Sequence, residues 1–285
     1  MSRPVIDQNL VIQKAVELPG FPRIVSAILD TIDDPDANFN ILTHLIEHDP
    51  VIAARVLAVA NAAAERTRRP SAIRDIYAAA SMIGIGRVRS VALIGSCVDF
   101  FDKIGAPDQA ATFWQHSVAV GICAEEIALH MDHPISASAA LIAGLLHDIG
   151  QLWLYRFDRL GFRSAWQGAL THGKGIDITE REQFGVDHTV VGAWLAEHWG
   201  LPPSLVAAIR GHHHGDSLLD EPLVAVTHVA EVLSNALDLT GRKENRVTQL
   251  SATACNQLGL AWDEHSRQLF GRIDARSRHA NTFFA

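Results

Sequence analysis

Apolar residues recur along this chain at intervals of three and four, and alternating β-branched runs of the strand type are almost absent. Residues 22–32 are a clear case. There the spacing places Ile24, Ile28 and Ile32 on one stripe of a helix, which can face a core. Because the same periodicity covers most of the sequence, it predicts an all-α fold.

Helix start and stop signals divide this pattern into segments. A residue before proline is disfavoured in the helical conformation, so Asp49-Pro50 separates two helices. Ser136 suits the N-cap of the apolar run that follows it, and Gly150 suits the end of that helix. The predicted helices are residues 22–32, 41–48, 50–63, 73–82, 88–101, 113–130, 137–149, 177–184, 188–199, 203–212, 223–239, 247–258 and 263–273.

Composition narrows the class of protein. Of the 285 residues, 48% are hydrophobic and 20% are charged, which excludes a disordered chain or a fibre. No stretch approaches the roughly 20 apolar residues of a bilayer span, and the first residues mix charge with apolar positions, unlike a signal peptide. Three widely spaced cysteines without a CxxC pair argue against disulfides and zinc ribbons. We expect a cytoplasmic protein that does not bind membranes.

A change in composition at residues 103–111 indicates a boundary between two helical lobes. We predict an N-terminal lobe over residues 1–106 and a second lobe over residues 107–285. Because the connecting segment is short, we expect the lobes to be subdomains of one unit.

Histidine is frequent in this chain, with 15 residues, and several fall on different predicted helices of the second lobe. Imidazole is the commonest metal ligand, and helical bundles build metal sites from inward-facing side chains of separate helices. Adjacent ligands lie about 100° apart around a helix, so a His-Asp pair reaches one ion only at the helix end, or two bridged ions. Imidazole and carboxylate suit Fe, Mn, Zn or Ni. The predicted ligands of a divalent metal are His116, His147, Asp148, His188, His212 and His213.

Several sequence strings together resemble a known family. In the second lobe they are FWQHSVAV at 113–120, AGLLHDIG at 143–150, GVDHTVVGAWLAEHWGLP at 185–202 and AAIRGHHH at 207–214. In the first lobe they are LPGFPRIVSAILD at 18–30, LIEHDPVIAARVLAVANAA at 45–63 and AAASMIGIGRVRSVAL at 78–93. From about residue 18 to residue 240 the chain resembles the HDOD family, the HD-related output domains of bacterial signalling proteins. The resemblance implies a multi-helix bundle like the HD domain with an additional N-terminal helical lobe.

The resemblance also implies a role for the predicted ligands. In catalytic HD-type relatives, the matching side chains bind metal ions that activate a water to attack phosphorus. A distal aspartate usually completes that set, and the matching residue here is Glu231, which the resemblance adds as the seventh predicted ligand. Its extra methylene moves the oxygen by about 1 Å, which argues against catalysis. The lysine that follows HDIG in active HD-GYP enzymes is Gln151 here, and no Asp-Gly-x-Gly-Tyr-Pro element follows the histidine cluster. We therefore do not expect hydrolysis of cyclic di-GMP.

Two functions remain in competition. The first is an HDOD-type signal-transduction protein, such as a response-regulator output. It would be non-catalytic or weakly catalytic, would bind a metal or a small phosphate-containing ligand, and would bind a signalling protein partner through its first lobe. The alternative is a metal-dependent phosphohydrolase or phosphodiesterase that uses a metal-activated water. The net charge of -8 argues against a nucleic-acid partner, although one basic face is predicted from Arg66, Arg68, Arg69, Arg87 and Arg89.

Several of these histidines also have a purely structural explanation. Asp148 could orient His147 or cap a neighbouring helix, His116 could be a hydrogen-bonded interior residue, and His188 could neighbour a helix cap. His228 could be a packing residue or, one turn before Glu231, a substitute ligand. The predicted centre therefore depends on whether the rings face a common volume.

Overall fold

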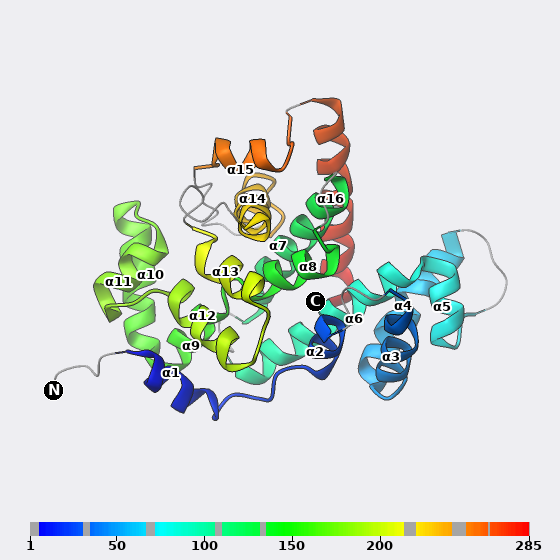
Figure 1. The fold of residues 1–285 in the computed structure, drawn as a ribbon, viewed down its shortest axis with the longest axis horizontal. Helices are drawn as coiled ribbons and strands as arrows, with labels where there is room; N and C mark the ends of the chain where they lie inside the picture. The colour runs from blue at the N-terminus through cyan, green and yellow to red at the C-terminus, as the bar shows by residue number, and fades with distance from the viewer. Residues whose placement is uncertain are drawn as a thin grey trace. The chain divides into compact units, whose positions relative to one another are not determined.

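The structure, a computed structural model, describes residues 6–30, 35–66, 72–105, 110–131, 135–213, 221–240, 249–261 and 263–284. These residues form helices and connecting turns with no strand among them, which confirms the all-α prediction (Figure 1). The helices are α1 (Gln8–Ala15), α2 (Arg23–Asp30), α3 (Pro35–Glu47), α4 (Pro50–Arg66), α5 (Ile76–Ile83), α6 (Ile85–Ile104), α7 (Ala110–His130), α8 (Ala137–Leu146), α9 (Ile149–Phe157), α10 (Arg159–His172), α11 (Ile176–Phe184), α12 (His188–His198), α13 (Pro203–Gly211), α14 (Pro222–Ala236), α15 (Ala252–Gln257) and α16 (Glu264–Phe284).

The chain divides into two compact units. Unit 1 consists of the described residues of Met1–Gly20 and Phe101–Arg278. Unit 2 consists of those of Phe21–Phe100 and His279–Ala285. Helix α1 thus belongs to unit 1, where it packs against α12. The predicted boundary after residue 106 lies outside the described residues and stays a prediction.

Unit 2 contains the helices α2 to α5 and most of α6. Within this unit, Arg55 joins α4 to α6, because its Nη1 donates to the Gly95 carbonyl at 3.1 Å and to Asp99 Oδ1 at 2.9 Å. Of the arginines in the predicted basic face, Arg68 and Arg69 lie outside the described residues.

The centre of unit 1 is the pair α7 and α8, with α14 packed against both. Ser136 caps α8 as predicted, accepting from the Ala139 amide at 3.4 Å. A Cβ on Gly144 would lie 2.6 Å from the Cα of Gly121, so only glycine permits this approach of the two helices. The approach brings the C-terminal end of α8 close to α7.

The prediction that Gly150 ends the helix of residues 137–149 is wrong. Helix α8 ends at Leu146, and Gly150 is the second residue of α9. The reason is packing, since a Cβ on Gly150 would overlap the carbonyl of His188 at the start of α12. The break between α8 and α9 therefore falls at the His147-Asp148 pair.

Some predicted helices differ from the observed ones at their ends, and some observed helices were not predicted. The last helix continues to Phe284, and α15 begins at Ala252 because Ser251 caps it. Residues 247 and 248 of the predicted helix 247–258 lie outside the described residues. Helices α1, α9 and α10 were not predicted. Helix α10 carries many polar residues, and apart from Phe162 its buried residues are glycine and alanine. Helix α1 is only 8 residues long.

Two apolar stretches of the described chain meet the length and hydropathy of a membrane span. The stretch Ala137–Phe157 does so alone, and 89% of its most apolar window is buried within the protein. The pair Ile76–Ile83 and Ile85–Ile104 does so together, with a bend of 116° between the two helices.

Candidate metal centre

The seven predicted ligands, which come from five parts of unit 1, converge in the structure. They form two groups in which the ligand atoms lie within 4.8 Å of one another. The first group is His116, His147 and Glu231, and the second is Asp148, His188, His212 and His213. The rings therefore face a common volume, as the metal-site prediction requires.

The first group joins helices α7, α8 and α14. Glu231 Oε2 lies 2.9 Å from His116 Nε2 and 3.3 Å from His147 Nε2. Asn235, one turn further along α14, donates to the other Glu231 oxygen at 2.9 Å and so orients this carboxylate. The longer side chain of glutamate therefore reaches the ring nitrogens of the other two residues.

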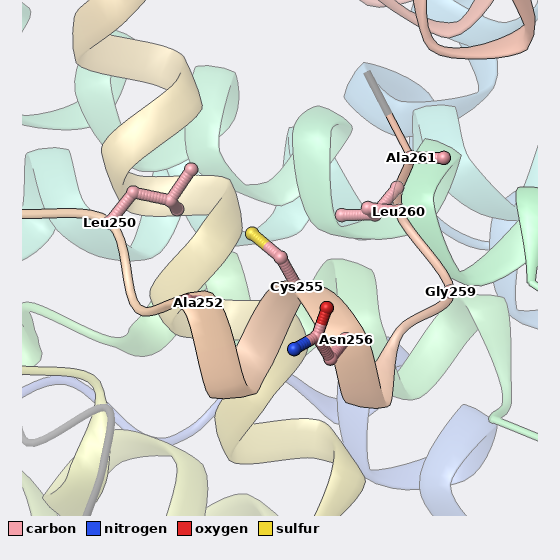
Figure 2. Close-up of a pocket in the computed structure, with 7 residues that line it drawn as sticks. All are labelled: Leu250, Ala252, Cys255, Asn256, Gly259, Leu260 and Ala261. Carbon is pink, nitrogen blue, oxygen red and sulfur yellow. The ribbon is translucent and has the colours of Figure 1, made fainter. Parts of the chain in front are cut away.

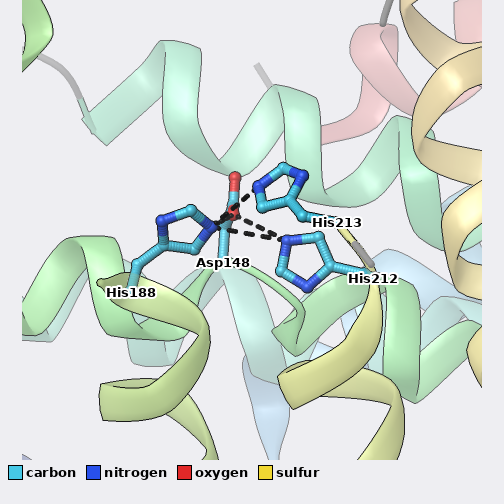
Figure 3. Close-up of side chains that lie close together, drawn as sticks. All are labelled: Asp148, His188, His212 and His213. Atoms are coloured by element: carbon cyan, nitrogen blue, oxygen red, sulfur yellow. Dashed lines mark hydrogen bonds and ion pairs between the residues drawn. The ribbon is translucent and has the colours of Figure 1, made fainter. Parts of the chain in front are cut away.

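The second group surrounds the Asp148 carboxylate with three imidazoles (Figure 3). His188 begins α12, and His212 and His213 follow directly after α13. The His188 Nε2 lies 3.4 Å from His212 Nε2 and 3.0 Å from His213 Nε2. Three ring nitrogens this close are arranged as ligands of one ion would be, since ligands about 2.1 Å from an ion are about 3.0–3.4 Å apart.

Asp148 lies between the two groups and presents one carboxylate oxygen to each. Its Oδ2 lies 3.7 Å from His116 Nε2 and 3.3 Å from His147 Nε2. Its Oδ1 lies 3.3 Å from His188 Nε2 and 3.7 Å from His212 Nε2. Asp148 makes no side-chain capping bond at the start of α9, so its carboxylate serves the cluster and not a helix end.

Outer hydrogen bonds point the Nε2 atoms of two rings into the cluster. The Nδ1 of His147 donates to the Gly144 carbonyl at 2.7 Å, and the Nδ1 of His212 donates to the Ile209 carbonyl at 2.8 Å. A carbonyl only accepts, so the proton is on Nδ1 in both rings, the usual arrangement for a metal-binding histidine. Among the described residues, buried His147 Nε2, Asp148 Oδ1 and Glu231 Oε2 have the ion-pair contacts given above but no hydrogen bond, which fits a site built for a cation.

Charge within the cluster is shared between carboxylates and two of the rings. Burial by itself lowers the pKa of His147, but the Asp148 and Glu231 carboxylates outweigh it and raise the pKa to about 10. Burial is likewise outweighed at His188, where Glu180 and Asp148 raise the pKa to about 9. Burial opposes ionisation of Asp148 too, yet the neighbouring rings hold its pKa well below the usual range. The metal-free cluster is therefore an ion-paired network at neutral pH.

The stability of the metal-free protein is expected to fall as the pH rises from neutrality. The pKa values of His147 and His188 in the fold, about 10 and about 9, lie above the ordinary value of 6.5. Their ion pairs therefore contribute fully below pH 6.5, and the contribution is lost as pH rises through 9 and 10. Thermal unfolding between pH 7 and pH 10 measures this loss. Protein loaded with metal should lose less, because its bound rings are already neutral.

Sequence reasoning missed Glu180, a fully buried carboxylate on α11. Glu180 Oε2 lies 2.5 Å from His188 Nδ1 and accepts from the His188 amide at 2.8 Å. A carboxylate on the outer nitrogen of a metal-binding histidine fixes the orientation of the ring. The sequence offers no signal for this pair, because it depends on how α11 packs beside the start of α12.

Changing Glu180 to glutamine is expected to lower metal affinity by about 10–100-fold, the usual cost of losing such an outer carboxylate. The amide cannot supply the charge that orients the His188 ring. Glu182→Gln is the matched control, because Glu182 lies on the same helix and is exposed, with its carboxylate 2.5 Å from Lys174 Nζ. Competition titration with a chelating dye measures both variants. Equal affinity of the two variants would contradict the role of Glu180.

Other residues of interest lie outside the cluster. His214 lies outside the described residues, and Gln151 is buried in α9. A separate pocket of about 560 Å³ lies along α15, where Leu250, Ala252, Cys255, Asn256, Gly259, Leu260 and Ala261 line it (Figure 2). None of the seven predicted ligands lines this pocket, so it is not the metal centre.

Comparisons with known proteins assign this helical chain with its His/Asp cluster to a family. A family model of the HDOD domain matches residues 18–215. The chain belongs to the HDOD family.

Solved structures share this fold. An HDOD domain protein of unknown function from Geobacter sulfurreducens is 23% identical, with a TM-score of 0.76 and coverage of 98% of this chain and 99% of that one. A candidate phosphohydrolase from Shewanella amazonensis SB2B is 24% identical, with a TM-score of 0.68 and coverage of 96% and 98%. A candidate signal transduction protein from Marinobacter aquaeolei VT8 is 21% identical, with a TM-score of 0.74 and coverage of 96% and 61%.

An uncharacterised protein of Treponema pallidum (strain Nichols) is 23% identical over 263 residues, which are 84% of this chain. The match covers 48% of the Treponema protein, so the chain spans about half the length of this relative.

Proposed function

We propose that this HDOD protein holds two divalent cations in unit 1, bridged by Asp148, and that the centre binds a phosphate-containing ligand as part of a bacterial signalling response. The observation that carries the proposal is the division of the cluster, in which Asp148 turns one oxygen toward each group of ligands. A buried carboxylate between two sets of imidazoles would bring like-charged ions together and partly neutralise them.

The first cation would be held by His116, His147 and Glu231, and the second by His188, His212 and His213. Iron, manganese, zinc and nickel all suit imidazole and carboxylate ligands. With the carboxylates of Asp148 and Glu231 as the only charged ligands, two divalent ions would leave a net positive charge. That charge favours an anionic ligand such as phosphate.

A second candidate function, phosphohydrolase, is favoured by the completeness of the ligand set, including the reach of Glu231 to His116. A divalent ion lowers the pKa of a bound water toward neutrality, which makes it a nucleophile for attack on phosphorus. In this chain Asp148 would orient such a water and the buried rings would exclude bulk solvent. Gln151, in place of a lysine, supplies no cation for the phosphoryl group.

One experiment separates these functions. Purified protein is supplied in turn with Mn, Fe, Zn and Ni, and bound metal per chain is measured by mass spectrometry. Two ions per chain are expected, and no bound metal after supplementation would refute the proposal.

Loaded protein is then tested for binding of inorganic phosphate and for hydrolysis of bis(p-nitrophenyl) phosphate. Phosphate binding without turnover supports a regulatory centre, whereas turnover that disappears in His147→Ala supports a hydrolase.

A signalling protein partner is proposed to bind unit 2. The exposed apolar side chains Ile41, Val51 and Tyr77 lie on three of its helices, α3, α4 and α5. Protein interfaces bury exposed apolar side chains of this kind. A partner bound through this unit should lose affinity in Val51→Glu, and unchanged affinity would place the interface elsewhere.

A further inference from the structure

His228 lies on α14, and its ring contacts the backbone of a predicted ligand but is not among the clustered ligand atoms. It is 6% exposed, and its Nδ1 lies 2.8 Å from the backbone carbonyl of His212. Its Nε2 accepts from the Ser251 amide at 3.2 Å. Both ring nitrogens are thus engaged by backbone groups, and neither is available to coordinate a metal.

These two bonds fix the protonation of the ring. The His212 carbonyl can only accept, so His228 Nδ1 must carry a proton, and the Ser251 amide can only donate, so Nε2 must be unprotonated. Ser251 is itself held in place, because its hydroxyl caps α15 by accepting from the Ala254 amide at 3.0 Å. The ring of His228 is therefore a rigid bridge between the start of α15 and the end of α13.

The bridge ends at the backbone that carries two predicted ligands. His212 follows the last residue of α13, where carbonyl groups lack partners within the helix. The bond from His228 satisfies this carbonyl and fixes the plane of the peptide between His212 and His213. The orientation of that peptide sets the direction of both rings. His212 Nε2 lies 3.7 Å from Asp148 Oδ1, and His213 Nε2 lies 3.0 Å from His188 Nε2.

We infer that His228 is a positioning residue for the second cation, acting through the His212-His213 backbone. The inference rests on the proposed two-cation centre. Helix α14 then serves both halves of the site, since Glu231 contributes a carboxylate to the first group and His228 supports the second. Loss of the His228 bonds should therefore affect the two cations unequally.

The test compares His228→Leu with His228→Asn. Leucine removes both bonds, whereas the asparagine amide can place a donor where Nδ1 stood and keep the bond to the His212 carbonyl. Manganese is titrated while its electron paramagnetic resonance spectrum is recorded. In His228→Leu, we expect affinity for one of two ions to fall by about 10–100-fold, with loss of the signal from coupled ions. His228→Asn should retain most of that affinity. His198→Leu, an exposed change at the end of α12, is the control.

A second measurement needs no metal and keeps the inference separate from the proposed function. Nitrogen NMR of the histidine rings is recorded for metal-free wild-type protein, where His228 Nδ1 should show its hydrogen bond to the His212 carbonyl. In His228→Leu the ring signals of His212 and His213 should shift, while those of His116 stay. Equal weakening of both cations, or unmoved His212 and His213 signals, would each overturn the inference. A wild-type protein that binds no metal would refute the two-cation centre, whereas shifted His212 and His213 signals would still show that His228 orients these two rings through the backbone.

Discussion

Asp148→Asn is expected to abolish high-affinity binding of metal at both halves of the centre. The change removes the negative charge that faces four imidazoles and leaves an amide whose nitrogen cannot coordinate a cation. The loss should exceed the roughly 10–100-fold cost of removing an outer partner, because Asp148 is proposed to bind the ions directly. Metal analysis after supplementation and desalting measures the number of ions retained per chain.

A matched control for this change is Asp158→Asn. Asp158 caps α10 in the same unit, accepting from the Gly161 amide at 2.8 Å, and asparagine caps helices about as well as aspartate. The control should keep both ions and its unfolding temperature. Retention of one ion in Asp148→Asn would show that the carboxylate serves a single cation, and retention of two would remove Asp148 from the centre.

The sequence indicated which side chains converge better than how they are arranged. Histidines on separate apolar helices indicated a metal site, and resemblance to the HDOD family added Glu231. The partition into two groups could not be predicted, because it depends on which oxygen of Asp148 faces which ring. The doubt about Glu231 came from its extra methylene, but the structure places its oxygen 2.9 Å from His116 Nε2.

Residues that support the ligands were harder to predict than the ligands themselves. Glu180 and His228 act on backbone or outer ring atoms, and neither position has a distinctive spacing from the residue it supports. Their bonds exist only because α11 and α14 lie beside the start of α12 and the end of α13. Periodicity predicts the helices, whereas these contacts require the packed fold.

Gly150→Ala is expected to destabilise the protein and to disrupt the second half of the centre. The added methyl group would overlap the His188 carbonyl and approach the Gly192 amide, so α9 and α12 must move apart. Backbone atoms cannot adjust as a flexible side chain can, and we expect a loss of about 2 kcal/mol or more in the free energy of unfolding. This corresponds to a fall in unfolding temperature of about 4–8 °C. Calorimetry of the metal-free protein measures it.

Gly168→Ala separates this effect from the general consequence of replacing a helical glycine. A Cβ on Gly168 in α10 would meet only Thr179 Cγ2 at 3.8 Å, an ordinary contact, so the change should stabilise the protein by about 0.5–1 kcal/mol. Movement of α12 in Gly150→Ala also carries His188 away from Asp148, whose present distance is 3.3 Å. Metal affinity should therefore fall together with stability in Gly150→Ala and stay unchanged in Gly168→Ala. If Gly150→Ala keeps wild-type affinity, close packing of α9 on α12 is not what positions His188.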